Sequence, residues 1–452
     1  MSQARKRRRA RRRTRSFVKC LQEFLTPQLW KQVRCASRAR QEPRWNVHCL
    51  LFVLCTTTWC CGDSLPERFE AARGFYVACH DKRKRPGRTF EGFQKAVARL
   101  PMPVLRTFAN ALRQRIFMLL GERMLVHGFR PLGCDGSRLD CPRAEELEGR
   151  LGTSGKAGSA PSVWTTALVH LTLGVPWAWR WGKGGKASER DHLRALLHCL
   201  PALALVVCDA GYVGYELTAA LMRQEVSFLI RLSSNATLYT LEYVPLEEFE
   251  EGMVYYWPDT ARRAGLPPLR TRLIRVRGSQ SKRDVWLLTN VEDMQRLPRD
   301  VAAYFYRCRW ENEGFFRTYK RTLKKVKLVS RTVRTVHREA EAAMLATQLL
   351  LAQGALAQRP PKCRKAAVPC SPRRVLLEIR REISGTGPRR SFAARLAQAS
   401  RERRERTTPK QKREWPRRKE HRPPGPPKIL TLTKQLKAQA ERALQQQLRN
   451  AG

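Results

Sequence analysis

Hydrophobic residues recur at helical spacing in the first part of the chain. Phe93 and Val97, for example, lie four residues apart in a run whose other apolar members keep the same period. Ser64, with Glu67 three residues later, is typical of a capping box, which begins a helix. We therefore expect a helical domain over residues 16–128.

The pattern changes to that of strands after this helical part. A short strand leads to Asp135, and two β-rich runs, 163–170 and 174–181, are separated by a turn and predict an antiparallel hairpin. Residues 203–208 are apolar without a break, which is typical of a strand buried on both faces. This run leads directly into Asp209.

The α/β part continues through an insertion and ends on two helices. Residues 233–282 alternate short β-like pieces with turns, which predicts a β-rich insertion. Residues 285–290 return to the apolar strand pattern, and we expect one helix from about residue 299 to residue 320 after it. A last helix, from about 337 to 358, closes a domain that we place at residues 129–358.

The helix expected at residues 299–320 carries a narrow polar face. Its members fall within one arc over about four turns, at about 100° per residue. They are Tyr306, Arg309, Glu313 and Lys320. A carboxylate that contacts a metal, beside cations that contact a phosphate, would be placed in this way. Taken alone, such a stripe is more often a solvated salt-bridge face. Trp310, Phe315 and Phe316 favour a packed helix instead.

The charge of the chain predicts an anionic polymer as its partner. The 88 Lys and Arg residues against 39 Asp and Glu residues give a formal net charge of +49. Nucleic acid is the usual partner of such a protein, although charge alone predicts no reaction. Residues 1–15 form a basic arm that we expect to lie along phosphates. A basic turn within residues 16–128 suits a DNA-binding domain and equally suits any helical domain with a charged loop.

The end of the chain has a different composition. Pro and cations dominate residues 359–452. We expect a poorly ordered basic tail there, with two helical pieces near residues 374–383 and 433–449.

The 14 cysteines argue against a secreted or zinc-binding protein. They form no CxxC pair, and the basic N-terminus lacks the apolar segment of a secretory signal. We expect reduced, mostly buried thiols in a cytoplasmic protein. The most apolar run, residues 49–61, is too short to span a bilayer and predicts a buried helix, so we expect no membrane partner.

Three carboxylates stand out by position, because Asp135 and Asp209 follow predicted strands and Glu313 lies on the later helix. Strand ends of a mixed sheet converge on a crevice, where such a set can hold two divalent cations about 4 Å apart. Arg309 and Lys320 beside them would hold phosphate oxygens. Each aspartate is also an ordinary turn former. Taken alone, the turn is favoured for Asp135, and the two interpretations are balanced for Asp209.

The polar face matches the signature of a known family. The residues with their spacing are Tyr306-x2-Arg309-x3-Glu313-x6-Lys320. This is the full YREK signature of DDE transposases of the insertion-sequence-four family, which the chain resembles. Residues 134–137 resemble the first Asp motif of that family, and residues 209–217 resemble the second. The resemblance covers about residues 60–350.

The resemblance implies a fold and an activity. The fold would be α/β, with a ribonuclease-H-like catalytic core that a β-rich insertion interrupts and a helical N-terminal domain precedes. The activity would be cutting at insertion-sequence ends and joining of 3′-hydroxyls to target DNA, with two Mg²⁺ or Mn²⁺ ions. The implied partner is double-stranded DNA of the terminal repeats and of the target, bound by a dimer. Such a protein would work in the bacterial cytoplasm, associated with the nucleoid.

The resemblance also assigns roles to residues. The implied metal ligands are Asp135, Asp209 and Glu313. The implied DNA contacts near the transposon end are Tyr306, Arg309 and Lys320. Trp257, in the insertion, is a candidate for strand distortion, and its simpler role is that of a core aromatic.

Two alternatives stay open. One is a related nuclease that cuts without strand transfer, and the other is an inactive DNA-binding protein. The presence of all three carboxylates and of the full YREK set favours activity.

Overall fold

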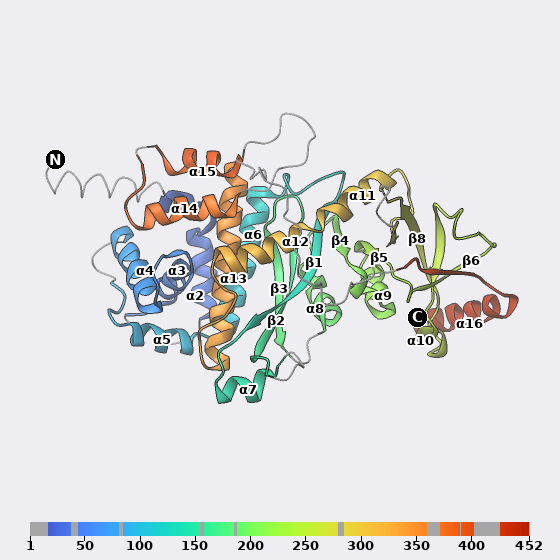
Figure 1. The fold of residues 1–452 in the computed structure, drawn as a ribbon, viewed down its shortest axis with the longest axis horizontal. Helices are drawn as coiled ribbons and strands as arrows, with labels where there is room; N and C mark the ends of the chain where they lie inside the picture. Colours follow the sequence, from blue (N-terminus) through green and yellow to red (C-terminus); the bar gives the residue numbers. More distant parts are fainter. Residues whose placement is uncertain are drawn as a thin grey trace, which may run out of the picture. The chain divides into compact units, whose positions relative to one another are not determined.

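The computed structural model divides the chain into two compact units, and Figure 1 labels most of their helices and strands. Unit 1 comprises residues 1–124, 136–187 and 311–404, and unit 2 comprises residues 125–135, 188–310 and 405–452. The structure describes residues 17–37, 44–80, 85–153, 158–184, 188–278, 284–358, 371–388, 390–401 and 425–451. The basic arm predicted at the N-terminus lies outside these residues, and the predicted domain boundaries stay predictions.

Helices make up the first part of unit 1, as the hydrophobic spacing predicts. The side-chain oxygens of Asn46, Ser64 and Thr89 each accept a hydrogen bond from the backbone N–H three residues later and so begin helices. The Ser64 half of the predicted capping box is confirmed, because the backbone N–H of Glu67 donates to Ser64 Oγ over 3.3 Å. The Glu67 carboxylate accepts from the backbone N–H of Asp63 over 3.0 Å instead of that of Ser64. The helices are α2 (Pro27–Ala36), α3 (Val47–Trp59), α4 (Leu65–Cys79), α5 (Phe90–Arg99) and α6 (Met102–Leu120). Helix α3 is the buried helix predicted from the apolar run.

Helix α13 (Val333–Ala357) forms the core of unit 1. By length and composition it could cross a membrane. However, 89% of its most apolar stretch of 18 residues is buried within the protein, as expected for a core helix. Trp59 Nε1 donates to the carbonyl oxygen of Ala346 over 3.1 Å and ties α3 to it. Arg123 Nη1 donates to three carbonyl oxygens at the C-terminal end of α13, over 2.9 to 3.1 Å. Arg123 therefore caps carbonyls that the helix itself leaves unpaired.

Two helices of the predicted tail pack into unit 1. They are α14 (Pro372–Ile383) and α15 (Phe392–Arg401), and the buried Arg395 joins them by pairing with Glu378 and Glu382. Both bury apolar side chains beside α13. Helix α14 confirms the helical piece predicted near residues 374–383, and α15 was not predicted. The expectation of a poorly ordered tail is wrong around both helices, because their apolar positions outweigh the Pro-rich and cationic composition.

Unit 1 also holds one end of the sheet. Strands β2 (Ser162–His170) and β3 (Pro176–Lys183) pair antiparallel, which confirms the predicted hairpin. Helix α7 (Glu145–Leu151) precedes β2. Strand β1 (Arg130–Asp140) continues through the boundary between Asp135 and Gly136, so its two halves belong to different units.

Unit 2 holds the other strands. Strand β4 (Ala204–Cys208) runs parallel to the first half of β1, and β5 (Ser227–Arg231) runs parallel to β4. The predicted insertion is β-rich, as expected, and its strands pair antiparallel up to β9. The strands of the insertion are β6 (Thr237–Thr240), β7 (Glu251–Tyr256) and β8 (Leu269–Val276). Strand β9 (Val285–Thr289) is the apolar strand predicted after the insertion, and it pairs antiparallel with β8 and β5. The helices are α8 (Glu189–Leu196), α9 (Tyr215–Arg223), α10 (Asp259–Arg263) and α11 (Arg299–Cys308).

The strand order confirms the predicted fold class. Along the sheet it is β3-β2-β1-β4-β5-β9-β8-β7-β6-β10. In the first five strands, β1, β2 and β3 are successive neighbours, and β4 and β5 lie parallel to β1 on its other side. This arrangement is that of a ribonuclease-H-like core, and the insertion strands extend the sheet beyond it.

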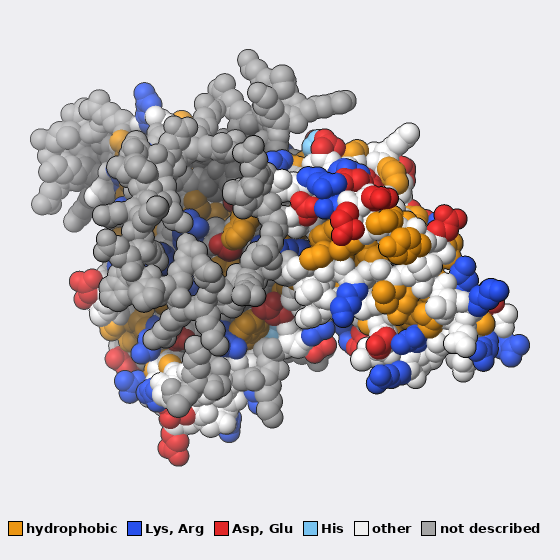
Figure 2. All heavy atoms as spheres, turned by 45° about the vertical axis from the view of Figure 1, so that its right-hand side comes forward, with side chains coloured by type: hydrophobic (Ala, Val, Ile, Leu, Met, Phe, Trp, Pro, Cys, Tyr) orange, Lys and Arg blue, Asp and Glu red, His pale blue; other side chains and the backbone are white. Residues whose placement is uncertain are grey.

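The last described residues pack on the insertion in unit 2. Strand β10 (Lys428–Thr431) pairs parallel with β6, and α16 (Lys434–Ala451) follows it. Trp257 lies in the resulting core cluster, fully buried beside Tyr239, Leu432 and Ala440. The helix was predicted here and the strand was not. Figure 2 shows cationic, acidic and apolar side chains intermixed on the face of unit 2 that it presents.

Candidate active site

Asp135 and Asp209 lie side by side in unit 2. The parallel pairing of β1 with β4 runs from Arg130 opposite Ala204 to Gly133 opposite Val207. Two positions further, the same register puts Asp135 beside Asp209, on strands about 4.8 Å apart. Burial and the neighbouring Cys134, one position earlier on the other strand, raise the pKa of the Cys208 thiol, which agrees with that register.

The predicted end of the first strand is wrong by five residues. Strand β1 continues past Asp135 to Asp140. Strand β4 ends at Cys208, so the edge of β1 that pairs with β4 loses this partner at Asp135. The second half of β1 continues in unit 1. Asp209 does follow its strand directly, as predicted, and its Oδ1 accepts the backbone N–H of Ala210 over 2.9 Å.

Three further side chains contact the Asp209 carboxylate. The hydroxyl of Tyr306 donates to Oδ1 over 3.0 Å. Arg309 Nη2 lies 3.5 Å from Oδ2, and Arg231 Nη1 lies 3.7 Å from Oδ1. Asp209 itself keeps 42% of its side chain exposed. The carboxylate is therefore held by cations and a hydroxyl and stays accessible to solvent.

Arg309 is a buried cation that the carboxylates stabilise. Burial alone lowers the pKa of Arg309, but the charge of Asp209, with smaller contributions from Tyr306 and Asp135, raises it overall. Burial and the charge of Asp209 raise the pKa of Tyr306, so its hydroxyl stays protonated and can donate. The Nε of Arg309 is buried without a hydrogen-bond partner in the described residues. Its guanidinium carbon lies 5.1 Å from the ring centroid of Trp310.

Sequence reasoning missed Arg231. Strand β5 pairs with β4 from Ser227 opposite Leu205 to Ile230 opposite Cys208. The next position in that register puts Arg231 beside Asp209. Three parallel strands therefore present Asp135, Asp209 and Arg231 in one row. The sequence does place the cation of Arg231 at the end of a predicted strand. Only the register of that strand with β4 shows that Arg231 faces Asp209.

The expectation of one continuous helix through the polar face is wrong. Helix α11 ends at Cys308, and the N–H groups of Arg309 and Trp310 bond to carbonyls only three residues earlier. Helix α12 (Glu311–Arg317) then begins, and a π-helical turn, η3 (Thr318–Thr322), follows it. The turn and the wider π spacing break the 100° progression, so the four residues do not share a face of one helix.

The remaining residues of the polar face lie in unit 1. Glu313 is on α12, with an exposed side chain, and Lys320 is in η3, half-buried. Burial lowers the pKa of Lys320, and the charge of Asp140 partly opposes this. Phe315 and Phe316 are buried, as expected for a packed helix. Trp310, expected to be packed, is 60% exposed.

The metal ligands predicted from the resemblance stay predictions. In the part of the chain that the structure describes, no group of three or more His, Cys, Asp or Glu residues could hold a metal ion. The neighbouring carboxylates of Asp135 and Asp209 supply hard oxygen donors of the kind that Mg²⁺ and Mn²⁺ prefer. They fit part of a metal site, which a third carboxylate would complete.

Comparisons with known proteins agree with part of this reading. Residues 165–349 match a family described as the transposase DDE domain. The matched range contains Asp209, Glu313 and the other YREK residues, and it begins after Asp135. No curated protein matches the chain.

One solved structure is similar over most of its length. It is the cryo-EM structure of a piggyBac transposase synaptic complex with hairpin DNA. Sequence identity is 11%, the TM-score is 0.40, and the match covers 83% of this chain and 80% of that one. The ribonuclease-H-like fold class rests on the strand order of the sheet.

Proposed function

We propose that this chain, whose matched domain is that of a DDE transposase, cuts the ends of an insertion sequence and joins the freed 3′-hydroxyls to target DNA. The observation that carries the proposal is the row of Asp135, Asp209 and Arg231 on three parallel strands, with Tyr306 and Arg309 on the Asp209 carboxylate. The matched domain is a metal-dependent enzyme of DNA cleavage and strand transfer. The full YREK spacing supports the insertion-sequence-four family in particular.

Asp135, Asp209 and Glu313 would hold the metal, as two Mg²⁺ or Mn²⁺ ions. Bound there, the ions would activate the attacking water or 3′-hydroxyl and stabilise the leaving 3′-oxygen. The register of β1 and β4, continued by two positions, places Asp135 and Asp209 side by side, so that their carboxylates could share a metal.

The cations of the site would bind the scissile phosphate. Arg309 and Arg231 neutralise Asp209 in the absence of DNA, and each can turn its remaining N–H groups to phosphate oxygens. Tyr306 holds one oxygen of Asp209 through its hydroxyl. Lys320 would contact DNA near the transposon end, and the lowered pKa of Lys320 reflects a half-buried amine that gains from a phosphate partner.

The proposal extends to partners and place. The substrate would be double-stranded DNA of the terminal repeats and of the target, bound by a dimer that brings two ends together. The net charge of +49 supports a nucleic-acid partner. The protein would work in the bacterial cytoplasm, associated with the nucleoid.

Cleavage of DNA that carries the inverted repeats flanking the reading frame tests the proposal. We expect the wild-type chain with Mg²⁺ to cut these ends and to join them to a target. Asp209→Asn should lower cleavage by several orders of magnitude while DNA binding persists, because the change removes a ligand charge and keeps the shape. Glu216→Gln, at an exposed carboxylate on α9, is the control and should cleave normally.

Three other outcomes would contradict the proposal in distinct ways. Cleavage without joining would indicate a nuclease. Binding without cleavage by the wild-type chain would indicate an inactive DNA-binding protein. Full cleavage by Asp209→Asn would show that Asp209 is not needed for the reaction and that the proposed active site is wrong.

A further inference from the structure

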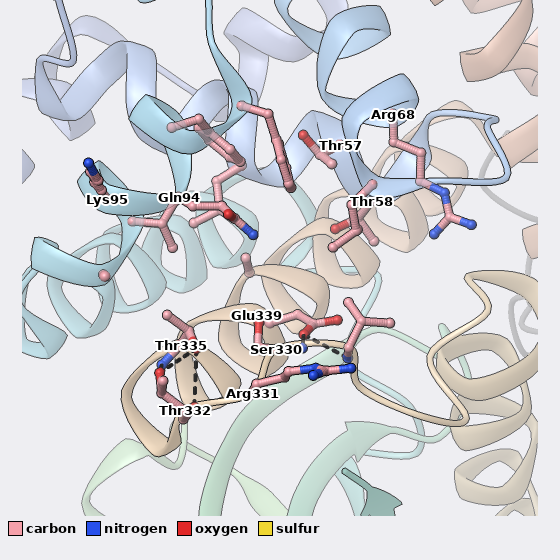
Figure 3. A pocket seen from close by; sticks show the side chains of 18 of the residues that line it. Thr57, Thr58, Arg68, Gln94, Lys95, Ser330, Arg331, Thr332, Thr335 and Glu339 are labelled. Carbon is pink, nitrogen blue, oxygen red and sulfur yellow. Dashed lines mark hydrogen bonds between the residues drawn. The ribbon is translucent and has the colours of Figure 1, made fainter. Parts of the chain in front are cut away.

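Unit 1 contains a cavity that the proposed chemistry does not use. It lies between helices α3, α4 and α5 on one side and residues 325–342 on the other, and Figure 3 shows it from close by. Its volume is about 560 Å³, which is in the range of sites that bind small organic molecules, roughly 300 to 1,000 Å³. The apolar part of its lining includes Leu54, Leu65, Phe90, Phe93, Val97 and Ala342.

The cavity has an apolar wall that includes two aromatic rings. Phe93 is 5% exposed and stacks on Phe69 with 5.0 Å between ring centroids, so its position is fixed. Phe90 is half-buried in the same cluster. Gln94 and Thr58 line the cavity with an amide and a hydroxyl, groups that could bond to the edge of a heterocycle.

The charges at the cavity are cationic. Figure 3 shows Arg68 and Arg331 on opposite walls, and Lys95 lies on α5 at a third side. Glu339 is the one acidic residue among the described lining residues. It is already engaged, because Lys325 Nζ donates to its Oε1 over 2.8 Å and two backbone N–H groups donate to its Oε2. The lining therefore complements an anion that also has an apolar part.

Charge argues against other segments of this chain as the occupant. Residues 1–16 and 359–370 contain Lys and Arg but no Asp or Glu, and a second copy of the chain carries the same net charge of +49. Like charges across an interface disfavour binding. Nucleotides combine a flat apolar ring with a phosphate, and DNA is the partner that the proposed function already requires.

We propose that this cavity binds an unpaired nucleotide of DNA, with the base against Phe90 and Phe93 and the phosphate groups at Arg68 and Arg331. Bases stack on aromatic side chains without regard to sequence. The site would therefore hold frayed or single-stranded DNA and would leave the choice of sequence to other contacts. This inference rests on the proposed function for the identity of the partner and is independent of the carboxylate site.

A short oligonucleotide and its abasic counterpart test the base. The full chain is titrated with fluorescein-labelled hexathymidylate and with an abasic hexamer of the same charge. We expect the base-containing hexamer to bind at least about tenfold more tightly, in line with one or two base–aromatic stacks. Ala98→Trp, which fills the cavity, should remove that preference. Ala438→Trp, at an exposed position on α16, is the matched control and should keep it.

A charge reversal tests the phosphate contact without disturbing the packing. Arg331 is exposed, so Arg331→Glu should fold normally. It should weaken hexathymidylate binding and reduce the salt slope by about 0.7. Arg442→Glu makes the same charge change on α16 and should leave both unchanged. Photocrosslinking of 5-iodouracil in the hexamer should label residues 90–98 or 329–335.

The following results would overturn the inference. They are equal binding of the two hexamers, a base preference that survives Ala98→Trp, or a salt slope that Arg331→Glu leaves unchanged. Crosslinks confined to other segments, or saturation of the cavity by laurate with no competition from the hexamer, would also overturn it. Such results would leave end cleavage untouched. Conversely, a chain that shows the base preference but cuts no ends would contradict the proposed function and leave this site standing.

Discussion

At the scale of single residues, neighbouring strands set the position of Asp209. Backbone pairing puts Asp135 on one side of it and Arg231 on the other, and α11 with the turn that follows it adds Tyr306 and Arg309. We propose that the two guanidinium groups beside Asp209 change partners when metal and DNA bind. They would leave the carboxylate to the metal and bind phosphate oxygens instead.

Arg231 should matter to cleavage as much as the residues of the signature. We expect Arg231→Ala to lower the single-turnover rate of end cleavage by about 100-fold, the usual loss when one preorganised charge at a reacting centre is removed. Arg231→Lys should restore only part of it, because an ammonium lacks the bidentate geometry. Arg223→Ala, at an exposed position on α9, is the control. A rate for Arg231→Ala equal to that of Arg223→Ala would show that Arg231 does not contribute to cleavage.

The residues of the site were predictable to different degrees. Asp209 could be found because an apolar strand leads into it, and Asp135 because a family motif surrounds it. Arg231 could not be found, because its meaning depends on a register offset of 22 positions between β4 and β5 that leaves no trace in local spacing.

At the scale of elements, helical periodicity predicted where helices are and failed where they change type. Helices α3, α4 and α5 begin on capping residues that the sequence shows. The interruption between α11 and α12 and the π turn after α12 depend on which carbonyl each N–H selects. Spacing of apolar residues does not carry that information, so the common face of Tyr306 and Lys320 was an incorrect extrapolation.

Helix α13 carries two acidic residues whose protonation should have opposite effects on stability. Burial raises the pKa of Glu341, and hydrogen bonds from the indole N–H groups of Trp179 and Trp181 oppose this. Because the folded state then holds the proton more tightly, the contribution of Glu341 to stability falls as pH rises above about 4.3, the usual value for Glu. Glu341→Gln keeps an acceptor oxygen and removes this loss.

We expect Glu341→Gln to raise the free energy of unfolding more at pH 8 than at pH 4, by about 1.4 kcal/mol for each unit by which the pKa is raised. Glu339→Gln is the contrast. The charge of Lys325 and backbone N–H groups outweigh burial and lower the pKa of Glu339, so its stabilisation is present above about pH 4.3 and lost below. That variant should lose stability at pH 8. Thermal unfolding across this range measures both, and the same sign for the two variants would contradict the assignment.

At the scale of the whole molecule, composition misjudged the end of the chain. The Pro-rich and cationic sequence after residue 359 suggested a tail, yet α14 and α15 complete the core of unit 1 and β10 with α16 cover the insertion in unit 2. The fold class was predictable because strand order follows from a few strong apolar runs. The edge strand β10 was not, since four residues with alternating exposure resemble a loop.

Removal of residues 425–452 should expose the edge of the sheet in unit 2. Strand β6 would lose its parallel neighbour, and Trp257 would lose Leu432 and Ala440 from its surroundings. We expect a red shift of tryptophan emission and concentration-dependent aggregation, because unpaired edges associate. Removal of residues 449–452 alone serves as the control. A soluble truncated chain with unchanged emission would show that β10 and α16 do not hold this edge.

The most direct test of the central claim is a count of Mn²⁺ ions bound to the chain with its end DNA, measured by electron paramagnetic resonance. We expect two tightly bound ions for each active site in the wild-type chain. We expect a loss of at least one ion in Asp135→Asn, Asp209→Asn and Glu313→Gln, and no loss in Glu216→Gln. Wild-type Mn²⁺ binding by Glu313→Gln would contradict the claim that these three carboxylates share the metal.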